Sequence, residues 1–205
     1  MRIVATLAVA LVLVTGCSNN ESKPTPTPAR VDVHARQPAP GSFEVDATHS
    51  TVLFKATHAG AGYVYGWFKD VSGAFTIDAD PAKSHVELSV KVASVDTRDD
   101  ERNANIAGPD FLNAKQFPEL TFKSTRVDAT ATGWHIAGDL TIHGATKSVA
   151  FDAVLVGDAK GPQGRRLVGV EARFTITRGD FGVSFMPEMV GPDLELIVAL
   201  EGAAV

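Results

Sequence analysis

Hydrophobic and polar residues alternate along most of the chain from residue 43 onward, as expected for β-strands that bury one face. Between residues 86 and 92 the even positions are aliphatic, whereas Glu87, Ser89 and Lys91 occupy the odd positions. The same alternation recurs in further segments, at residues 52–56, 63–69, 75–77, 120–124, 134–142, 149–155, 168–176 and 194–200. The pattern predicts about eight strands.

Turn-forming residues separate these segments, so consecutive strands are expected to pair as antiparallel hairpins. They lie at residues 59–62, 80–81, 132–133, 143–144, 161–164 and 191–193. A sheet of this size with one apolar face needs a second layer or must close on itself, and the sequence offers almost no helix to form that layer. We therefore predict an all-β fold, an eight-stranded antiparallel barrel, with a β-sandwich as the alternative. The interior of such a barrel is wide enough for one small ligand.

The segment 98–118 interrupts the alternation. Its first half is charged and permits a helix that ends near Gly108 and Pro109. Its second half places Phe111, Leu112 and Phe117 close together in the sequence. We predict a short helical insert that covers one mouth of the barrel, with these apolar residues as a lid.

The first residues have the form of a secretory signal, with Arg2 followed by an apolar run from Ile3 to Val14. As a helix this run would cover about 18 Å, well short of the ~30 Å hydrocarbon core of a bilayer. The run ends in Val14-Thr15-Gly16-Cys17, which resembles the lipobox of bacterial lipoproteins. The resemblance implies a lipoprotein signal peptide at 1–16 and acylation of Cys17, which would anchor the mature protein to a membrane.

Cys17 is the only cysteine of the chain, so no disulfide is expected. Residues 17–42 are rich in proline and polar residues and predict a disordered tether between the acylated cysteine and a domain at 43–205. The formal net charge is −5 at pH 7 and there is no basic patch, so a nucleic-acid partner is not expected.

The domain also carries an ordered series of short motifs. They are Asp46-Ala-Thr-His49-Ser50, His58, Gly66-Trp-Phe68, Ser94-Val-Asp-Thr97, Asp110-Phe-Leu112, Phe117-Pro118, Phe122-Lys-Ser124, Gly138-Asp-Leu-Thr-Ile-His-Gly-Ala-Thr-Lys147 and Thr177-Arg-Gly-Asp-Phe-Gly182. In this order, from about residue 43 to 202, they resemble the YceI-like family of bacterial secreted proteins. The resemblance implies a lipocalin-like barrel that holds a long apolar chain, such as a polyisoprenoid, without catalysis.

One motif departs from the family pattern. Where the family usually has Arg-Asp-x-His-Leu, the chain reads Arg102-Asn103-Ala-Asn105-Ile106. Both ionisable side chains are replaced by asparagine, which changes the charge of any contact that this motif makes in packing or at the polar head of a ligand.

The candidate ligand-binding residues are aromatic residues of the predicted strands and lid, with two polar side chains. They are Phe54, His58, Trp67, Phe111, Phe122, Trp134, Phe151 and Arg178. His58 shares a strand face with Phe54 and could contact the polar end of a ligand or be satisfied by backbone groups. His49 has the opposite parity, so a regular strand cannot bring both histidines to one metal ion, and no metal site is expected. His49 is instead expected to brace the start of the barrel through Asp46 or Ser50.

Arg178 continues the inward series after Phe174 and Ile176, and a buried guanidinium needs a partner. An ion pair with Asp180 or another carboxylate is the favoured interpretation, with an anionic ligand head as the alternative.

No catalytic or cofactor motif is present in the sequence, so we expect a binding protein rather than an enzyme. Small inward residues such as Ala56 and Ala153 permit a tunnel for a polyisoprenoid or quinone-like lipid. The expected location is the periplasmic side of a membrane, and Ser18 in place of an aspartate after Cys17 favours the outer membrane. The alternatives are a side-chain-filled barrel that binds a partner protein through its loops, and an enzyme that uses His58 as acid or base.

Overall fold

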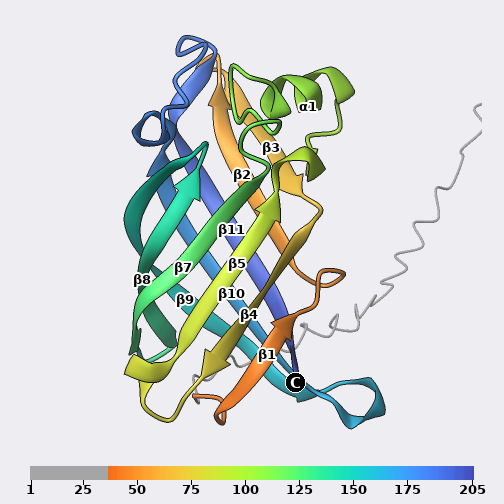
Figure 1. The fold of residues 1–205 in the computed structure, drawn as a ribbon, viewed down its shortest axis with the longest axis vertical. Coiled ribbons are helices and arrows are strands. Elements are labelled where there is room, and N and C mark those ends of the chain that lie inside the picture. Colours follow the sequence, from red (N-terminus) through yellow and green to blue (C-terminus); the bar gives the residue numbers. More distant parts are fainter. Residues whose placement is uncertain (1–36) are drawn as a thin grey trace, which may run out of the picture. The chain divides into compact units, whose positions relative to one another are not determined.

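A single antiparallel sheet closes into a barrel through the pairing of β1 with β11 in the computed structural model, which describes residues 37–205 (Figure 1). The strands are β1 (Gly41–Val45), β2 (Thr51–His58), β3 (Gly62–Phe68), β4 (Val71–Ile77), β5 (His85–Lys91), β6 (Val95–Asp96), β7 (Glu119–Ala129), β8 (Gly133–Ile142), β9 (Ala145–Lys160), β10 (Arg166–Thr177) and β11 (Val190–Ala204). The helical elements are α1 (Asp100–Ala107) and the 3-10 turns η1 (Pro81–Lys83), η2 (Val92–Ser94), η3 (Pro162–Gly164) and η4 (Arg178–Phe181). No helix within these described residues has the length and apolar character to cross a bilayer.

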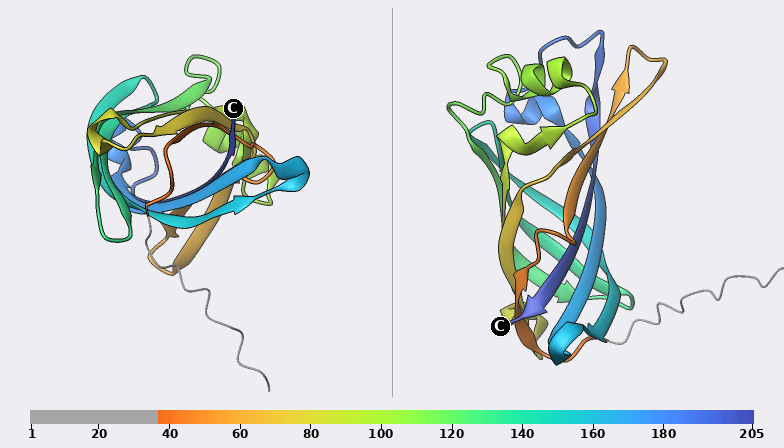
Figure 2. Two further views of the ribbon diagram at one scale, coloured as in Figure 1. Left: turned by 90° about the horizontal axis from the view of Figure 1, so that it is seen from below. Right: turned by 90° about the vertical axis from the view of Figure 1, so that its right-hand side faces the viewer.

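Three of the barrel's long strands are each broken into two short ones. β1 and β2 both pair with β11. On the other side β1 pairs with β4, and β2 pairs with β3. β4 then pairs with β5, and β3 with β6. Counting β1–β2, β3–β4 and β5–β6 as one strand each gives eight long strands, which form a closed ring when viewed along the barrel (Figure 2). The predicted eight-stranded antiparallel barrel is confirmed, and the sandwich alternative is wrong.

The predicted alternation sets which side chains face inward. On β8, for example, Trp134 and Leu140 are buried, whereas His135 and Asp139 are exposed. Close packing inside the barrel also explains Gly66 on β3, because a Cβ atom at this position would collide with the ring of Phe54. The inward side chains form two apolar clusters, and the smaller one includes Ile142, Ile176 and Phe181.

The predicted helical insert is present as α1, which lies at the end of the barrel opposite β1 (Figure 1). Asp99 caps the helix by accepting a hydrogen bond from Arg102 N at 2.7 Å. Ile106 and Leu112 pack against the larger core cluster, so the insert contributes to the closure of this end. Phe111 instead packs edge-to-face on Phe185, with ring centroids 5.4 Å apart.

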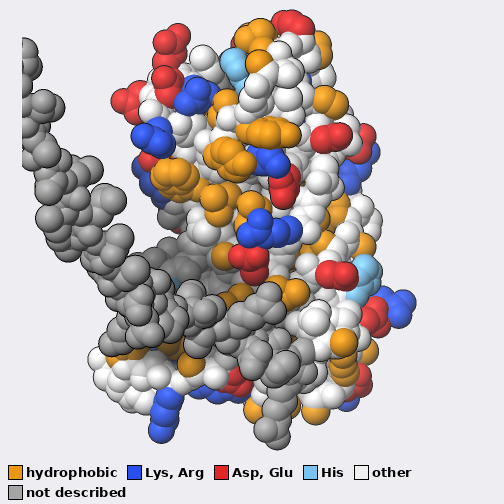
Figure 3. All heavy atoms as spheres, turned by 180° about the vertical axis from the view of Figure 1, so that it is seen from behind, with side chains coloured by type: hydrophobic (Ala, Val, Ile, Leu, Met, Phe, Trp, Pro, Cys, Tyr) orange, Lys and Arg blue, Asp and Glu red, His pale blue; other side chains and the backbone are white. Residues whose placement is uncertain are grey.

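The face of the barrel in Figure 3 carries charged side chains of both signs together with hydrophobic side chains. Many of these charges are paired across neighbouring strands. Lys55 contacts Glu195 at 2.7 Å and lies 4.4 Å above the centre of the Tyr63 ring. Such exposed pairs add little stability individually, so the folding energy of the barrel comes from its interior.

The first described residues are attached to the barrel, which shortens the predicted tether. Gln37 Nε2 donates to Gly133 O at 2.7 Å, and the Arg166 guanidinium donates to the carbonyls of Ala39 at 2.6 Å and Pro40 at 3.1 Å. Residues 41 and 42 belong to β1. The prediction of disorder through residue 42 is therefore wrong for 37–42. The predicted signal peptide, Cys17 and the rest of the tether lie outside the described residues.

The expectation for His49 is confirmed by its contacts at the turn between β1 and β2. His49 Nδ1 lies 3.0 Å from Asp46 Oδ2 and 3.7 Å from Glu201 Oε1. The hydrogen bond to Asp46 and the two negative charges raise the pKa of His49. Hydrogen bonds from Thr48 and His49 hold the pKa of Asp46 far below its usual range. The turn is thus tied to the last strand of the barrel.

Replacing His49 with glutamine is expected to destabilise the protein most at pH 5–6 and least at pH 9–10. The raised pKa of His49 gives stability that is complete below about pH 6.5 and is lost as the pH rises through the folded-state value. The lowered pKa of Asp46 gives stability that is complete above about pH 4 and is lost on further acidification. Thermal midpoints of both proteins across this pH range test the prediction. A difference that grew with pH would contradict it.

Candidate functional site

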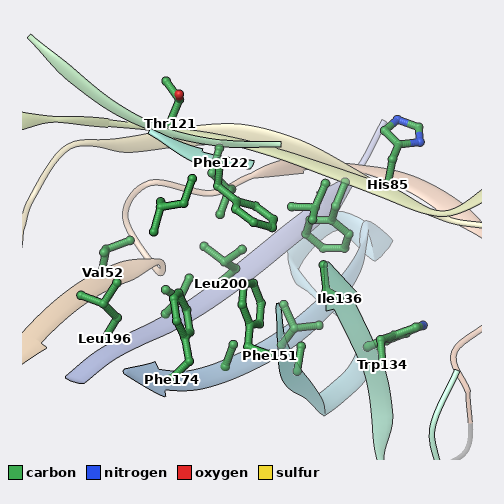
Figure 4. A pocket seen from close by; sticks show the side chains of 18 of the residues that line it. Val52, His85, Thr121, Phe122, Trp134, Ile136, Phe151, Phe174, Leu196 and Leu200 are labelled. Atoms are coloured by element: carbon green, nitrogen blue, oxygen red, sulfur yellow. The ribbon is translucent and has the colours of Figure 1, made fainter. Parts of the chain in front are cut away.

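The barrel is hollow: its interior contains an apolar cavity with a volume of about 150 Å³. Every strand except β1 and β6 contributes to the lining. Figure 4 shows inward-pointing side chains that face one another across the cavity, and they include Phe122, Ile136, Phe151, Phe174, Leu196 and Leu200. An apolar cavity of this size excludes water and can hold a small apolar molecule.

The cavity is long relative to its volume. On β8 it is lined from Trp134 to Ile142, a separation of about 26 Å at ~3.3 Å per residue. With the tilt typical of barrel strands, this corresponds to about 20 Å along the barrel axis. A modest volume spread over that length means a narrow channel, which suits a single extended chain better than a broad fused-ring molecule.

Small residues on two neighbouring strands create part of this space. Ala153 of β9 pairs directly with Ala172 of β10, and both are buried and line the cavity. Aromatic rings form the wall beyond them. Phe151 stacks on Phe174 with centroids 4.3 Å apart and planes 9° apart, and Phe122 lies 5.3 Å from Phe151. The mixture of large and small inward residues therefore leaves a channel, as the sequence permitted.

The lining is almost free of charge. Among the residues that line the cavity, His85 is the only one with a titratable side chain. Figure 4 shows the side chains of His85 and Thr121 pointing away from the cavity, so these residues line it with their backbone. The cavity thus offers neither an acid–base pair nor a set of metal ligands, and what it can do chemically is bind apolar surface.

The structure brings together only part of the predicted site. Phe122, Trp134 and Phe151 line the cavity. Phe54 packs on Phe68 in the core, with centroids 5.9 Å apart, and does not line it. The remaining candidates are placed elsewhere, namely His58, Trp67, Phe111 and Arg178.

Each of these four has a different environment. His58 is exposed at the last position of β2, beside the turn to β3. Trp67 lies between the buried residues Gly66 and Phe68 and so faces the opposite side of β3. Phe111 packs on Phe185 at the end that carries α1. The sequence-based site omitted the aliphatic wall from β10 and β11, although its alternation already placed these residues inward.

Arg178 is buried, but its partners are not the carboxylates predicted from the sequence. Its guanidinium donates to four backbone carbonyls, those of Val183, Phe185, Val190 and Gly191, at 2.7–3.1 Å. Burial lowers the pKa of the Arg178 guanidinium, yet an arginine stays protonated in a protein. The ion-pair expectation is therefore wrong: Arg178 binds backbone carbonyls of the loop before β11 and of the first two residues of β11.

Replacing Arg178 with methionine is expected to destabilise the barrel by about 4 kcal/mol, at ~1 kcal/mol for each lost hydrogen bond. The matched control is Arg173→Met on β10, the strand that precedes η4, because Arg173 forms an exposed pair with Glu171 and its loss should cost less than about 1 kcal/mol. Urea unfolding of both variants measures the difference. An equal loss of unfolding free energy in the two variants would show that the four carbonyl contacts of Arg178 do not stabilise the barrel more than an exposed ion pair does.

The asparagine that replaces the acidic residue of the family motif keeps a hydrogen-bonding role. Asn103 Oδ1 accepts hydrogen bonds from both the backbone N and the Oγ1 of Thr97, each at 2.7 Å. Arg102 donates to Thr97 Oγ1 and Thr97 O, each at 2.9 Å. An amide oxygen thus makes the acceptor contacts without a negative charge, whereas Asn105 is exposed. The motif acts in packing of the insert and does not reach the cavity.

A possible metal-ligand group among residues 37–205 lies on the outside of the barrel. It consists of Asp46, His49 and Glu201, whose ligand atoms lie within 4.8 Å of one another. Two of these side chains already bond to each other at 3.0 Å, as described above. This group has no connection with the cavity.

A closed eight-stranded antiparallel barrel around a cavity without inward-pointing charges is the architecture of the small β-barrels whose interior has room for one ligand. The more particular assignment comes from comparison with known proteins. A family model described as "YceI-like domain" matches residues 43–202, and the chain belongs to this family.

Two relatives illustrate the match. The chain is 37% identical over 155 residues to a UPF0312 protein of Serratia proteamaculans (strain 568), and the aligned region covers 75% of this chain and 81% of that protein. It is 36% identical over 161 residues to Protein YceI of Escherichia coli O17:K52:H18, and the aligned region covers 78% of this chain and 84% of that protein. The predicted family resemblance is confirmed.

Solved structures show the same architecture. BcnA of Burkholderia cenocepacia superposes with a TM-score of 0.69 at 25% identity, covering 77% of this chain and 98% of that one. A polyisoprenoid binding domain from Saccharophagus degradans gives a TM-score of 0.61 at 16% identity, covering 80% and 98%. The second likeness shows the fold alone.

Proposed function

We propose that this protein binds one long-chain apolar lipid, such as a polyisoprenoid or a quinone-like molecule, inside the barrel. The observation that carries the proposal is the long, narrow and uncharged cavity. The description of the Saccharophagus degradans domain as polyisoprenoid binding supports the same class of ligand. The prenyl tail would occupy the channel, and a bulky or polar head group would remain at or beyond its end.

Burial of apolar surface is sufficient to drive such binding. Each buried methylene contributes about 0.8 kcal/mol, so ten of them contribute roughly 8 kcal/mol before the ordering of the chain is counted, which corresponds to about micromolar affinity. Recognition of this kind depends on the length and width of the ligand rather than on a particular hydrogen bond. The protein would therefore store or carry a lipid without changing it chemically.

We further propose that the barrel acts at a membrane surface. Acylation of Cys17 would tether the protein to the periplasmic side of a bacterial membrane, with the outer membrane favoured by Ser18. The support is the sequence Val14-Thr15-Gly16-Cys17 after an apolar run. A tethered barrel stays close to the bilayer from which its lipid would come.

Mass spectrometry tests both parts of the proposal. Full-length protein purified from the membranes of its own host is analysed intact, and its lipids are extracted and identified. We expect one apolar lipid per barrel and a diacyl or triacyl mass increase on Cys17, which the Cys17→Ser variant lacks while still carrying the lipid. Protein that carries no lipid and binds none of a panel of prenols and quinones would refute the binding proposal.

A further inference from the structure

The barrel wall has a gap between β5 and β7. The last pair of this ladder is Glu87 with Lys123, and β7 then continues to Ala129 with β8 as its only strand partner among the described residues. At the start of the gap the backbone N of Val86 donates to Ser124 Oγ at 2.9 Å, so a side chain replaces the next ladder bond. A register shift on β7 follows immediately after Ser124.

The cavity extends to this gap. Its lining includes Ser84 and His85 from one side of the gap and Val127 from the other. Trp134 and His85 lie at one end of the cavity in Figure 4, and Val52 and Leu196 lie at the other end. The gap is therefore a place where the channel approaches the outside through the wall of the barrel.

The turn η1 and the residues beside it cover this gap. η1 lies against β7 at the end of the barrel opposite α1, and none of its residues is buried. Its hydrogen bonds are internal to residues 78–84: Ala82 N donates to Asp80 Oδ1 at 3.2 Å, and Asp78 N donates to Ser84 Oγ at 2.9 Å. Within the described residues, no hydrogen bond joins 78–83 to β7. This segment can move outward without breaking a ladder bond.

The other routes into the cavity are blocked by buried side chains. The ladder between β9 and β10 also stops short, after Ala153 and Ala172. That second gap is filled by the stacked rings of Phe151 and Phe174 and by η4, whose Arg178 and Phe181 are buried. Opening it would expose this packed core.

The two ends of the barrel are closed as well. Phe43 stacks on Phe75 at the end that carries β1, with centroids 5.1 Å apart. The insert with Ile106 and Leu112 packs on the core at the opposite end. Of the gaps in the wall, the one between β5 and β7 is thus covered by a segment in which Ser84 is the only buried residue.

We propose that residues 78–84 form a hinged flap over a portal between β5 and β7, through which an apolar chain enters and leaves the cavity. The inference rests on the proposed lipid-binding function and adds the route and the moving part. Local opening of a segment that buries only the small side chain of Ser84 requires far less free energy than unfolding of the barrel. The flap therefore sets the rates of loading and release, while the channel sets the affinity.

The test measures ligand exchange in the full-length protein by stopped-flow fluorescence. The probe is the methyl ester of cis-parinaric acid, a linear fluorescent polyene chain, and excess farnesol displaces it to give the release rate. The variant Pro81→Gly loosens η1, because proline at its first position fixes φ. Association and dissociation rates are expected to rise together by about two- to fivefold, the scale of the entropy difference between glycine and proline. The dissociation constant is expected to stay the same.

The matched control is Pro162→Gly, which changes the first position of another 3-10 turn, η3, away from the cavity lining. It should leave both rates unchanged. A second variant, Ser124→Ala, removes the side-chain bond at the start of the gap and should also accelerate exchange. The flap is refuted if the probe binds normally but Pro81→Gly exchanges it no faster than Pro162→Gly. Failure of the wild-type protein to bind either the probe or farnesol would instead refute the proposed function itself.

Discussion

Replacing Ala153 with phenylalanine is expected to weaken the binding of long apolar chains by roughly a thousandfold or more while the barrel stays folded. Ala153 is buried, lines the cavity and pairs with Ala172 in the ladder between β9 and β10. A phenyl ring at this position would occupy space otherwise taken by about six carbon atoms of the ligand. At ~0.8 kcal/mol per methylene, the loss is about 5 kcal/mol.

The control for this variant is the neighbouring residue on the other face of the same strand. Val154 is 40% exposed, so Val154→Phe adds the same ring to the outside of the barrel. It should leave binding unchanged. Calorimetric titration with farnesol or a longer prenol measures the affinity, and thermal unfolding checks the fold of each variant.

A graded variant guards against overpacking, which can destabilise a core by about 1–3 kcal/mol. Ala153→Leu adds three carbon atoms and should weaken binding by roughly 60-fold on the same scale. The set of variants separates an internal site from an external one. If Ala153→Phe folds and binds prenols as tightly as the wild type, the ligand does not lie in the channel.

The architecture was predictable from the sequence because its signal is local. Alternation with period two identifies the strands, and turn residues between them predict hairpins. Closure followed from the absence of helices that could cover an apolar sheet. The breaks within three long strands could not be read in this way, because they depend on which neighbour each half pairs with.

The cavity was less predictable because it depends on contacts between distant strands. Parity placed Phe122, Trp134 and Phe151 inward correctly, but it does not tell whether a residue meets a large or a small partner. The pairing of Ala153 with Ala172 creates space only in the correct register. His58 has inward parity too, yet it is exposed at the last position of β2, beside the turn to β3.

The partners of Arg178 also could not be predicted from the sequence. Its burial followed from its place after Ile176, and physical chemistry required that its charge be satisfied. The sequence contained no sign that backbone carbonyls of a loop would do so. The four carbonyls come from residues 183–191, and only the folded loop brings them to one guanidinium.

The affinity of a homologous series of linear alcohols is expected to increase about fourfold for each added methylene, up to the length at which the channel is full. This factor is the transfer free energy of ~0.8 kcal/mol per methylene, so five methylenes change the dissociation constant by roughly a thousandfold. Beyond the length of the channel, about 20 Å by the barrel geometry given above, the affinity should reach a plateau. Isothermal titration calorimetry of the series measures both the slope and the plateau.

The head group provides the control for the chain-length series, because the side chains that point into the cavity carry no charge. Exchanging the alcohol for an amide or a methyl ester at constant chain length should change the affinity by less than about threefold, since an exposed polar end keeps its water. A sterol of equal carbon number should bind much more weakly, because its fused rings are wider than the narrow channel. An affinity that followed the head group and ignored chain length would place the ligand on the barrel surface. A slope that disappeared in the Ala153→Phe variant would locate the growing end of the chain beside β9 and β10.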